Sequence, residues 1–269
     1  MTIAIIGTGN MGGAIMRGLI KSRICNPEDI VCTAKTEATL NKIREYDANV
    51  RISRDNASAV AAADIVVLAV KPWLVPEVLE EILPNLRPKE HVLVSVAAGV
   101  TLEQLAEIAI PPSSSEKDGV GLPLFRVIPN TAVETLCGVT FIAQYGATNQ
   151  QTEQIQRLFS ALGYTLIVDE KLLSAGTALA SCGIAFAMRY IRAAIEGGVE
   201  LGFRPEEAAR IVEHTVKGAA TLLLESGAHP EAEIDKVTTA GGVTIKGLNA
   251  MERAGFTAAV IDGLKATNV

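Results

Sequence analysis

The sequence predicts an α/β protein in which an N-terminal Rossmann-type doubly wound sheet is followed by an all-helical C-terminal domain. Short apolar runs of β type alternate with segments of helical periodicity as far as residue 168. A glycine-rich turn at 7–12 follows the first apolar run, and after Val168 only helical periodicity remains. We therefore expect a dinucleotide-binding domain over 1–168 and a helical domain over 169–269.

In the first domain, apolar and β-branched runs predict strands at 2–6, 30–33, 65–70, 92–96, 125–128, 139–143 and 165–168. Helical periodicity predicts helices at 10–22, 36–46, 55–63, 73–83 and 101–109. Thr-x-x-Gln sequences at Thr101 and Thr148 resemble capping boxes and predict two helix starts. The alternation predicts a parallel sheet with right-handed crossovers, and the polar, breaker-rich segment 111–121 is expected to be a loop.

In the second domain, helices are expected at 169–200, 205–226, 230–236, 243–253 and 256–266. Their apolar content exceeds what about a hundred residues need for a core of their own, so we expect a dimerisation domain and a homodimer, with higher oligomers left open. The uncharged stretch 172–188 is shorter than the ~20 residues that span a bilayer. A buried or interface helix is expected there, and no membrane partner.

Composition also bears on the partners, the compartment and the metal content to be expected. The formal charge is −6, with 24 basic and 30 acidic residues and no block of like charge, so a nucleic-acid partner is not expected. Four scattered cysteines without a CxxC pair, and no secretory leader, predict a cytoplasmic protein with reduced thiols. The three histidines form no set with ligand spacing, so no metal site is expected.

The glycine-rich turn predicts a dinucleotide site, because it follows a strand and opens a helix. Gly7 permits the tight turn, Gly9 lets the backbone approach a pyrophosphate, and Gly12 lets the helix pack on the strand. The pyrophosphate would meet free N–H groups at the helix N-terminus. The alternative is a purely structural turn. The expected binding residues are Gly7, Thr8, Gly9, Asn10, Met11 and Gly12.

The end of the second strand favours NADPH, with NADH possible. An NAD site places a carboxylate about twenty residues after the glycines to hold the ribose, but 33–36 reads Thr-Ala-Lys-Thr. Lys35 would attract a 2′-phosphate that a carboxylate would repel. The alternative for Lys35 is an ordinary solvated lysine.

A second glycine turn lies near the C-terminus, where Gly241-Gly242-Val243-Thr244 precedes an apolar-periodic run. The N–H groups of this helix start could hold a substrate carboxylate. An ordinary capped helix is the alternative for this segment taken alone.

Several motifs together resemble the pyrroline-5-carboxylate reductase family, in unbroken order from the first strand to about Asp262. The motifs are GTGNMG, AVKP (69–72), SVAAGV (95–100), VIPNT (127–131), ESGAHP (225–230) and GGVTIKGLNAMERAGF (241–256). The C-terminal motifs are far more specific than the glycine turn. The chain departs from the family pattern at 180–186 (ASCGIAF), at 239–244 (TAGGVT) and at Ala132, which we interpret as subfamily variation.

The resemblance implies roles at matching positions. Thr244 would be the catalytic residue, its hydroxyl meeting the ring nitrogen of the substrate. The implied substrate residues are Gly241, Gly242, Val243, Thr244 and Gly183. The implied cofactor residues beyond the glycine turn and Lys35 are Asn56, Val70, Lys71, Pro72, Ala97, Ala98, Gly99 and Asn130.

The implied activity is NADPH-dependent reduction of 1-pyrroline-5-carboxylate to L-proline, the last step of proline biosynthesis. Hydride addition to a protonated imine neutralises a cation, so no strong acid is needed. A β-hydroxyacid or ketopantoate-type dehydrogenase remains an alternative, but it uses a lysine acid, and 169–200 has no lysine after Lys171. A non-catalytic NADP-binding protein is the other alternative, given the altered segments 180–186 and 239–243.

Overall fold

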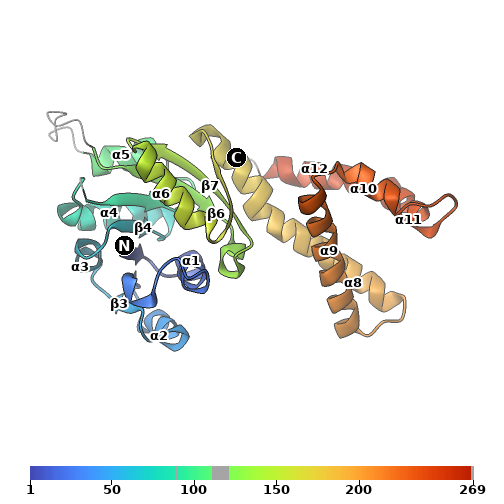
Figure 1. The fold of residues 1–269 in the computed structure, drawn as a ribbon, viewed down its shortest axis with the longest axis horizontal. Helices are drawn as coiled ribbons and strands as arrows, with labels where there is room; N and C mark the ends of the chain where they lie inside the picture. Colours follow the sequence, from blue (N-terminus) through green and yellow to red (C-terminus); the bar gives the residue numbers. More distant parts are fainter. Residues whose placement is uncertain (89, 111–120, 268–269) are drawn as a thin grey trace. The chain divides into compact units, whose positions relative to one another are not determined.

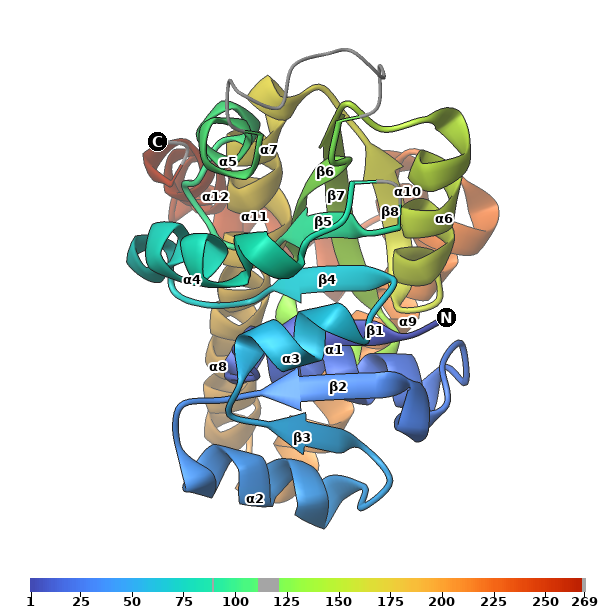
Figure 2. The same cartoon turned by 90° about the vertical axis from the view of Figure 1, so that its left-hand side faces the viewer.

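Eight strands form one sheet in the order β3-β2-β1-β4-β5-β6-β7-β8 (Figures 1 and 2). This computed structural model describes residues 1–88, 90–110 and 121–267, so most of the predicted loop at 111–121 lies outside the described residues. The strands are β1 (Ile3–Ile6), β2 (Ile30–Thr33), β3 (Arg51–Ser53), β4 (Ile65–Leu68), β5 (Val92–Ser95), β6 (Leu124–Pro129), β7 (Gly138–Tyr145) and β8 (Gly163–Ile167).

The strand pairing is parallel except between β6 and β7, which are antiparallel. The expectation of a parallel sheet is therefore wrong at this pair. Only the short 3-10 turn η4 (Thr131–Thr135) joins the two strands, and a parallel pair needs a crossover of a dozen residues or more. β3 was not expected, because this three-residue edge strand is polar and only partly buried.

Helices cover both faces of the sheet, which confirms the doubly wound fold. The helices of this part are α1 (Asn10–Lys21), α2 (Glu37–Tyr46), α3 (Asn56–Ala61), α4 (Val75–Ile82), α5 (Leu102–Ala109) and α6 (Asn149–Ser160). Ile3 and Ile5 pack in one core cluster with α1, α2 and α6, whereas Ala4 and Ile6 pack in the other with α3, α4 and α5. Successive side chains of a strand point to opposite faces, so β1 is buried on both.

Both predicted capping boxes are present. In α5, Gln104 N donates to Thr101 Oγ1 at 3.1 Å and Thr101 N donates back to Gln104 Oε1 at 2.9 Å. Thr148 and Gln151 make the same pair of bonds at the start of α6. Further connections are the 3-10 turns η1 (Pro27–Asp29), η2 (Pro72–Leu74), η3 (Leu83–Asn85) and η5 (Glu170–Leu172).

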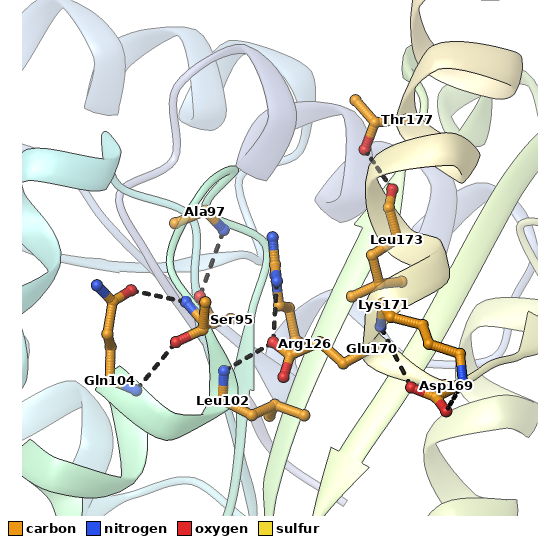
Figure 3. A network of polar contacts seen from close by, with 11 residues as sticks. Ser95, Ala97, Leu102, Gln104, Arg126, Asp169, Glu170, Lys171, Leu173 and Thr177 are labelled. Carbon is orange, nitrogen blue, oxygen red and sulfur yellow. Dashed lines mark hydrogen bonds and ion pairs between the residues drawn. The ribbon is translucent and has the colours of Figure 1, made fainter. Parts of the chain in front are cut away.

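The Glu170 carboxylate joins three segments that are far apart in sequence (Figure 3). It accepts a hydrogen bond from Leu102 N at the start of α5 (2.8 Å) and pairs with Arg126 Nη1 on β6 (2.9 Å). Arg126 is only 13% exposed, and its buried Nε has no hydrogen-bond partner within the described residues. The ion pair therefore ties η5 to the sheet.

The chain divides into two compact units, Met1–Thr177 and Ala178–Val269. The boundary expected between 168 and 169 lies before η5 and α7 (Leu173–Gly176), and it stays a prediction. A π-helical turn (Thr177–Cys182) interrupts the helix expected at 169–200. The helices that follow are α8 (Gly183–Glu200), α9 (Pro205–Ser226), α10 (Pro230–Lys236), α11 (Val243–Arg253) and α12 (Phe256–Ala266), as expected for a helical domain.

The second unit leaves most of its apolar side chains exposed. Among its described residues, only Ala178 and Ala208 are buried apolar residues. Leu201 and Leu224 are more than 80% exposed. A groove of about 840 Å³ is lined mainly by apolar side chains of α8, α9, α11 and α12, including Phe186, Tyr190, Met251, Phe256, Val260 and Leu264. One chain alone therefore does not provide a closed core for this unit.

The helical segment Glu170–Glu200 is, by length and composition, apolar enough to cross a membrane. Only 17% of its most apolar window is buried within one chain. This test does not separate a membrane span from a helix that packs against another copy of the chain. It is weak evidence for a membrane span.

Candidate functional site

The three glycines of the N-terminal turn are required for different reasons. Gly7 has φ +88°, and a Cβ there would lie 2.6 Å from Val70 Cγ1. A Cβ on Gly12 would lie 2.8 Å from Gly7 O, so α1 approaches β1 closely. A Cβ on Gly9 would meet none of the described atoms within 4 Å, which leaves open space before the first N–H groups of α1. This cradle fits a pyrophosphate.

The flanking residues of the turn have distinct environments. Thr8 is buried: its hydroxyl donates to Ile5 O at 3.3 Å, and its backbone N–H donates to Thr33 O at 2.8 Å. Asn10 is exposed and Met11 is partly exposed at the start of α1. Thr8 therefore fixes the turn to the ends of β1 and β2, whereas Asn10 and Met11 lie on its accessible side.

A hydrogen-bond chain links the turn to Asn56. Gly7 N donates to Thr33 Oγ1 at 3.3 Å, and the Thr33 hydroxyl donates to Asn56 Oδ1 at 2.7 Å. Asn56 Nδ2 then donates to Glu81 Oε2 on α4 at 3.0 Å. Asn56 is therefore held beside the end of β2, and its contact with a cofactor stays a prediction. Glu81 was not expected from the sequence.

The expected cofactor residues at the ends of β1 and β2 line one pocket of about 340 Å³. Its lining residues are Gly7, Thr33, Ala34, Lys35, Arg54, Asn56, Val70 and Val78, none of which is acidic. The sequence analysis did not predict Arg54 as a cofactor residue, because it did not predict β3. The available signal was a basic residue directly after a strand. Arg54 Nη2 donates to Lys35 O at 3.0 Å. The residues present fit an adenine dinucleotide that carries a 2′-phosphate.

The remaining expected cofactor segments follow β4 and β5 at the same edge of the sheet. Val70, Lys71 and Pro72 lie between β4 and η2, and Ala97 to Gly99 lie between β5 and α5. Gly99 has φ +80° and is exposed, whereas Ala97 is buried. Ligands of doubly wound sheets bind beyond the carboxyl ends of the strands, so these segments are well placed.

Asn130 has a structural role in addition to the expected one. It is only 4% exposed, and its Oδ1 accepts hydrogen bonds from Ala132 N (3.2 Å) and Val139 N (3.3 Å). The side chain therefore holds the antiparallel connection between β6 and β7. Contact of Asn130 with a nicotinamide stays a prediction.

The expected substrate turn lies at the start of α11. Gly241 has φ +69°, and a Cβ on Gly242 would clash with Thr239 Oγ1. Val243 is 83% exposed, and Thr244 is an exposed residue in the first turn, where N–H groups lack intrahelical acceptors. The Thr244 hydroxyl has no hydrogen-bond partner in the described part of the chain. Gly242 N already donates to Thr239 O at 3.0 Å, and the binding of an anion by this turn stays a prediction.

Gly183 opens α8 directly after the π-helical turn, and a Cβ there would lie 3.9 Å from Ala178 O. It lies in the same unit as the 241–244 turn, whereas the cofactor residues lie in the first unit. The assembly of substrate and cofactor sites into one centre stays a prediction.

Lys171, the lysine of the 169–200 segment, does not have the environment of a general acid. Its Nζ pairs with Asp169 Oδ2 at 2.9 Å, and both side chains are exposed. The Lys171 ammonium lowers the pKa of Asp169 through a hydrogen bond. This arrangement belongs to a surface ion pair.

Comparison with known families gives matches in both units. Residues 170–269 match the family described as pyrroline-5-carboxylate reductase dimerisation. Residues 2–99 match the family described as NADP oxidoreductase, coenzyme F420-dependent. These matches agree with the division into a nucleotide-binding part and a helical dimerisation part.

Individual relatives extend the match over nearly the whole chain. A pyrroline-5-carboxylate reductase 1 of Dictyostelium discoideum is 38% identical over 97% of this chain, which spans about half (48%) of that protein. A pyrroline-5-carboxylate reductase 2 of the same organism is 36% identical, with 97% of this chain and 89% of the relative covered. The enzyme of Methanosarcina acetivorans is 35% identical, with 97% and 93% covered.

Comparison with solved structures agrees with these sequence matches. A pyrroline-5-carboxylate reductase from Coxiella burnetii superimposes with a TM-score of 0.86 at 28% identity, covering 99% of this chain and 95% of that one. A Plasmodium falciparum pyrroline carboxylate reductase with NADP bound also gives 0.86, with 99% and 95% covered, but at 22% identity, so it supports the fold alone. The resemblance seen in the motifs is confirmed, and the chain belongs to the pyrroline-5-carboxylate reductase family.

Proposed function

We propose that this chain reduces 1-pyrroline-5-carboxylate to L-proline with NADPH, as the last step of proline biosynthesis. The observation that carries the proposal is the 36% identity to a reductase over 97% of this chain and 89% of that relative. The geometry of the nucleotide pocket supports it, because a glycine cradle, Lys35 and Asn56 meet at the carboxyl ends of the strands.

The residues of the first unit would bind and orient the cofactor. The Gly7 to Gly12 turn would hold the pyrophosphate, Lys35 the 2′-phosphate, and the segments after β4 and β5 would line the nucleotide and the nicotinamide. When bound, NADPH supplies the hydride that reduces the imine carbon.

The residues of the second unit would position the substrate. The N–H groups around Gly242 to Thr244 would bind the substrate carboxylate, and the Thr244 hydroxyl would orient the imine nitrogen. Reduction of a protonated imine yields a neutral amine, so the chain needs no strong acid. The ion pairing of Lys171 with Asp169 agrees with this chemistry and not with the lysine acid of a β-hydroxyacid dehydrogenase.

We also propose that the protein is a cytoplasmic homodimer. The match to a reductase dimerisation family over 170–269 and the exposed apolar groove of the second unit support a second copy as the partner. Assembly beyond the dimer stays open. The free cysteines, of which Cys25 and Cys32 are buried, are in keeping with a reducing compartment.

Steady-state turnover of the purified chain tests the proposed function. NADPH oxidation is followed by nicotinamide absorbance with pyrroline-5-carboxylate, and in parallel with ketopantoate and a β-hydroxyacid plus NADP. We expect rapid oxidation only with the cyclic imine, and slower oxidation of NADH. Activity only with the acids would make the chain a dehydrogenase, and no activity with any substrate would favour a non-catalytic NADP-binding protein.

A further inference from the structure

Arg54 brings a second cation to the nucleotide pocket. It follows β3 directly, and β3 pairs in parallel with β2, so Arg54 lies at the same sheet edge as Lys35. Its guanidinium reaches across to the neighbouring strand end, where Nη2 donates to Lys35 O at 3.0 Å. Both residues line the same pocket. The parallel pairing of β2 and β3 therefore places Lys35 and Arg54 in the lining of the same pocket.

The acidic side chains near these cations each accept a hydrogen bond from another residue of the protein. Asp55 Oδ1 accepts from Ser58 N and caps α3. Glu37, in the first turn of α2, pairs with Arg44 at 2.9 Å, and Glu81 accepts from Asn56 Nδ2. No acidic residue is among the described lining residues, so the side chains that line the pocket carry positive charge only, although the whole chain is acidic.

Arginine suits this place for a geometric reason. Its planar guanidinium carries five N–H donors, so one can remain on the Lys35 carbonyl while others face the pocket. Pairs of arginine with a phosphate are charge-assisted and often bidentate. Anchoring to a backbone carbonyl also reduces the side-chain entropy that binding would otherwise cost.

We propose that Arg54 is a specificity-determining residue that binds the 2′-phosphate of the adenine nucleotide together with Lys35. The inference rests on the proposed use of NADPH. Arg54 then contributes to the choice between NADPH and NADH, while the pyrophosphate turn binds both cofactors alike.

Binding of nucleotide fragments to the full chain tests this without hydride transfer. Titration calorimetry with 2′,5′-ADP and with 5′-AMP compares two nucleotides that differ only in the 2′-phosphate. We expect Arg54→Gln to weaken 2′,5′-ADP binding about 10- to 100-fold, as for loss of a charged hydrogen bond, and to leave 5′-AMP binding unchanged. Arg51→Gln is the matched control, because Arg51 is an exposed arginine at the other end of β3 and outside the pocket lining.

The inference is overturned if Arg54→Gln leaves 2′,5′-ADP binding unchanged, weakens both fragments equally, or has no larger effect than Arg51→Gln. It is also overturned if the unsubstituted chain does not prefer 2′,5′-ADP to 5′-AMP. Failure of the proposed function has a different signature: the chain would bind 2′,5′-ADP in an Arg54-dependent way and yet leave pyrroline-5-carboxylate unreduced.

Discussion

Thr244 is exposed in the first turn of α11, beside the helix N-H groups that would bind a carboxylate. If its hydroxyl hydrogen-bonds the imine nitrogen mainly in the transition state, Thr244→Ala lowers kcat/KM by about 100-fold. Thr244→Ser keeps the hydroxyl and should retain most of the activity. Steady-state kinetics with pyrroline-5-carboxylate measure both variants. Equal rates for the alanine variant and the unsubstituted chain would remove Thr244 from the mechanism.

Lys35 follows β2 and lines the nucleotide pocket. Lys35→Ala removes a positive charge from the expected 2′-phosphate site, so the KM for NADPH should rise about tenfold while the KM for NADH changes little. The measurement is the KM for each nucleotide at saturating pyrroline-5-carboxylate. A similar rise for both nucleotides would make Lys35 a general surface lysine.

At the level of elements, His91 links the turn before β5 to the core. It is fully buried, and its Nδ1 accepts a hydrogen bond from Arg87 N at 2.9 Å. Burial, and next the positive charge of Arg87, lower the pKa of His91, while Glu90 and Asp64 act in the opposite direction. The unfolded chain therefore binds a proton more readily than the folded one in the range just below pH 6.5.

The free energy of unfolding is consequently expected to fall as the pH drops from 7 to 5. Above an ordinary histidine pKa of about 6.5 the contribution is fully present, and it is lost as the pH falls toward the lowered folded-state pKa. Urea unfolding followed by circular dichroism at fixed protein concentration measures it. His91→Asn keeps an acceptor for Arg87 N without this titration, so its pH dependence should be flatter. An identical pH dependence for both proteins would contradict the assignment.

The Arg126–Glu170 pair connects β6, α5 and η5 (Figure 3). Glu170→Ala leaves a mostly buried guanidinium without its carboxylate, so we expect a loss of about 1–3 kcal/mol in the free energy of unfolding. Glu103→Ala, at an exposed position in the first turn of α5, is the control and should cost much less. Urea denaturation distinguishes the two. Equal losses would show that the pair contributes little.

The elements that the sequence predicted well are those fixed by local signals. The boxes at Thr101 and Thr148 depend on bonds within four residues, and the buried strands have continuous apolar runs. β3 was missed because pairing with β2, and not its own residues, makes it a strand. Arg54 and Glu81 were missed for the same reason, since their contacts join residues that are distant in sequence. Tertiary contacts of this kind have no local periodicity.

On the scale of the whole molecule, the exposed apolar groove of the second unit predicts that the unit is stable only with a partner. Val260 lines this groove and is 44% exposed in the single chain. Val260→Asp places a charge on that surface, so we expect dissociation to a 28.3 kDa monomer in sedimentation velocity.

A control for this variant is available in the first unit. Tyr46 on α2 is exposed to a similar extent (46%) but lies far in sequence from the dimerisation match. Tyr46→Asp should therefore leave the sedimentation coefficient of the dimer unchanged. A dimer that survives Val260→Asp would exclude this groove from the subunit interface.

The position of β1 in the sheet has a consequence for folding while the protein is being synthesised on the ribosome. β1 is buried on both faces, and its two neighbours in the sheet, β2 and β4, both follow it in the chain. An emerging polypeptide must therefore carry the apolar tetrapeptide Ile3–Ile6 without any partner until Ile30–Thr33 has been synthesised, and with one side unpaired until Ile65–Leu68 follows. During this delay an apolar, aggregation-prone segment is exposed. Early binding of a chaperone near the exit tunnel would therefore raise the yield of native enzyme.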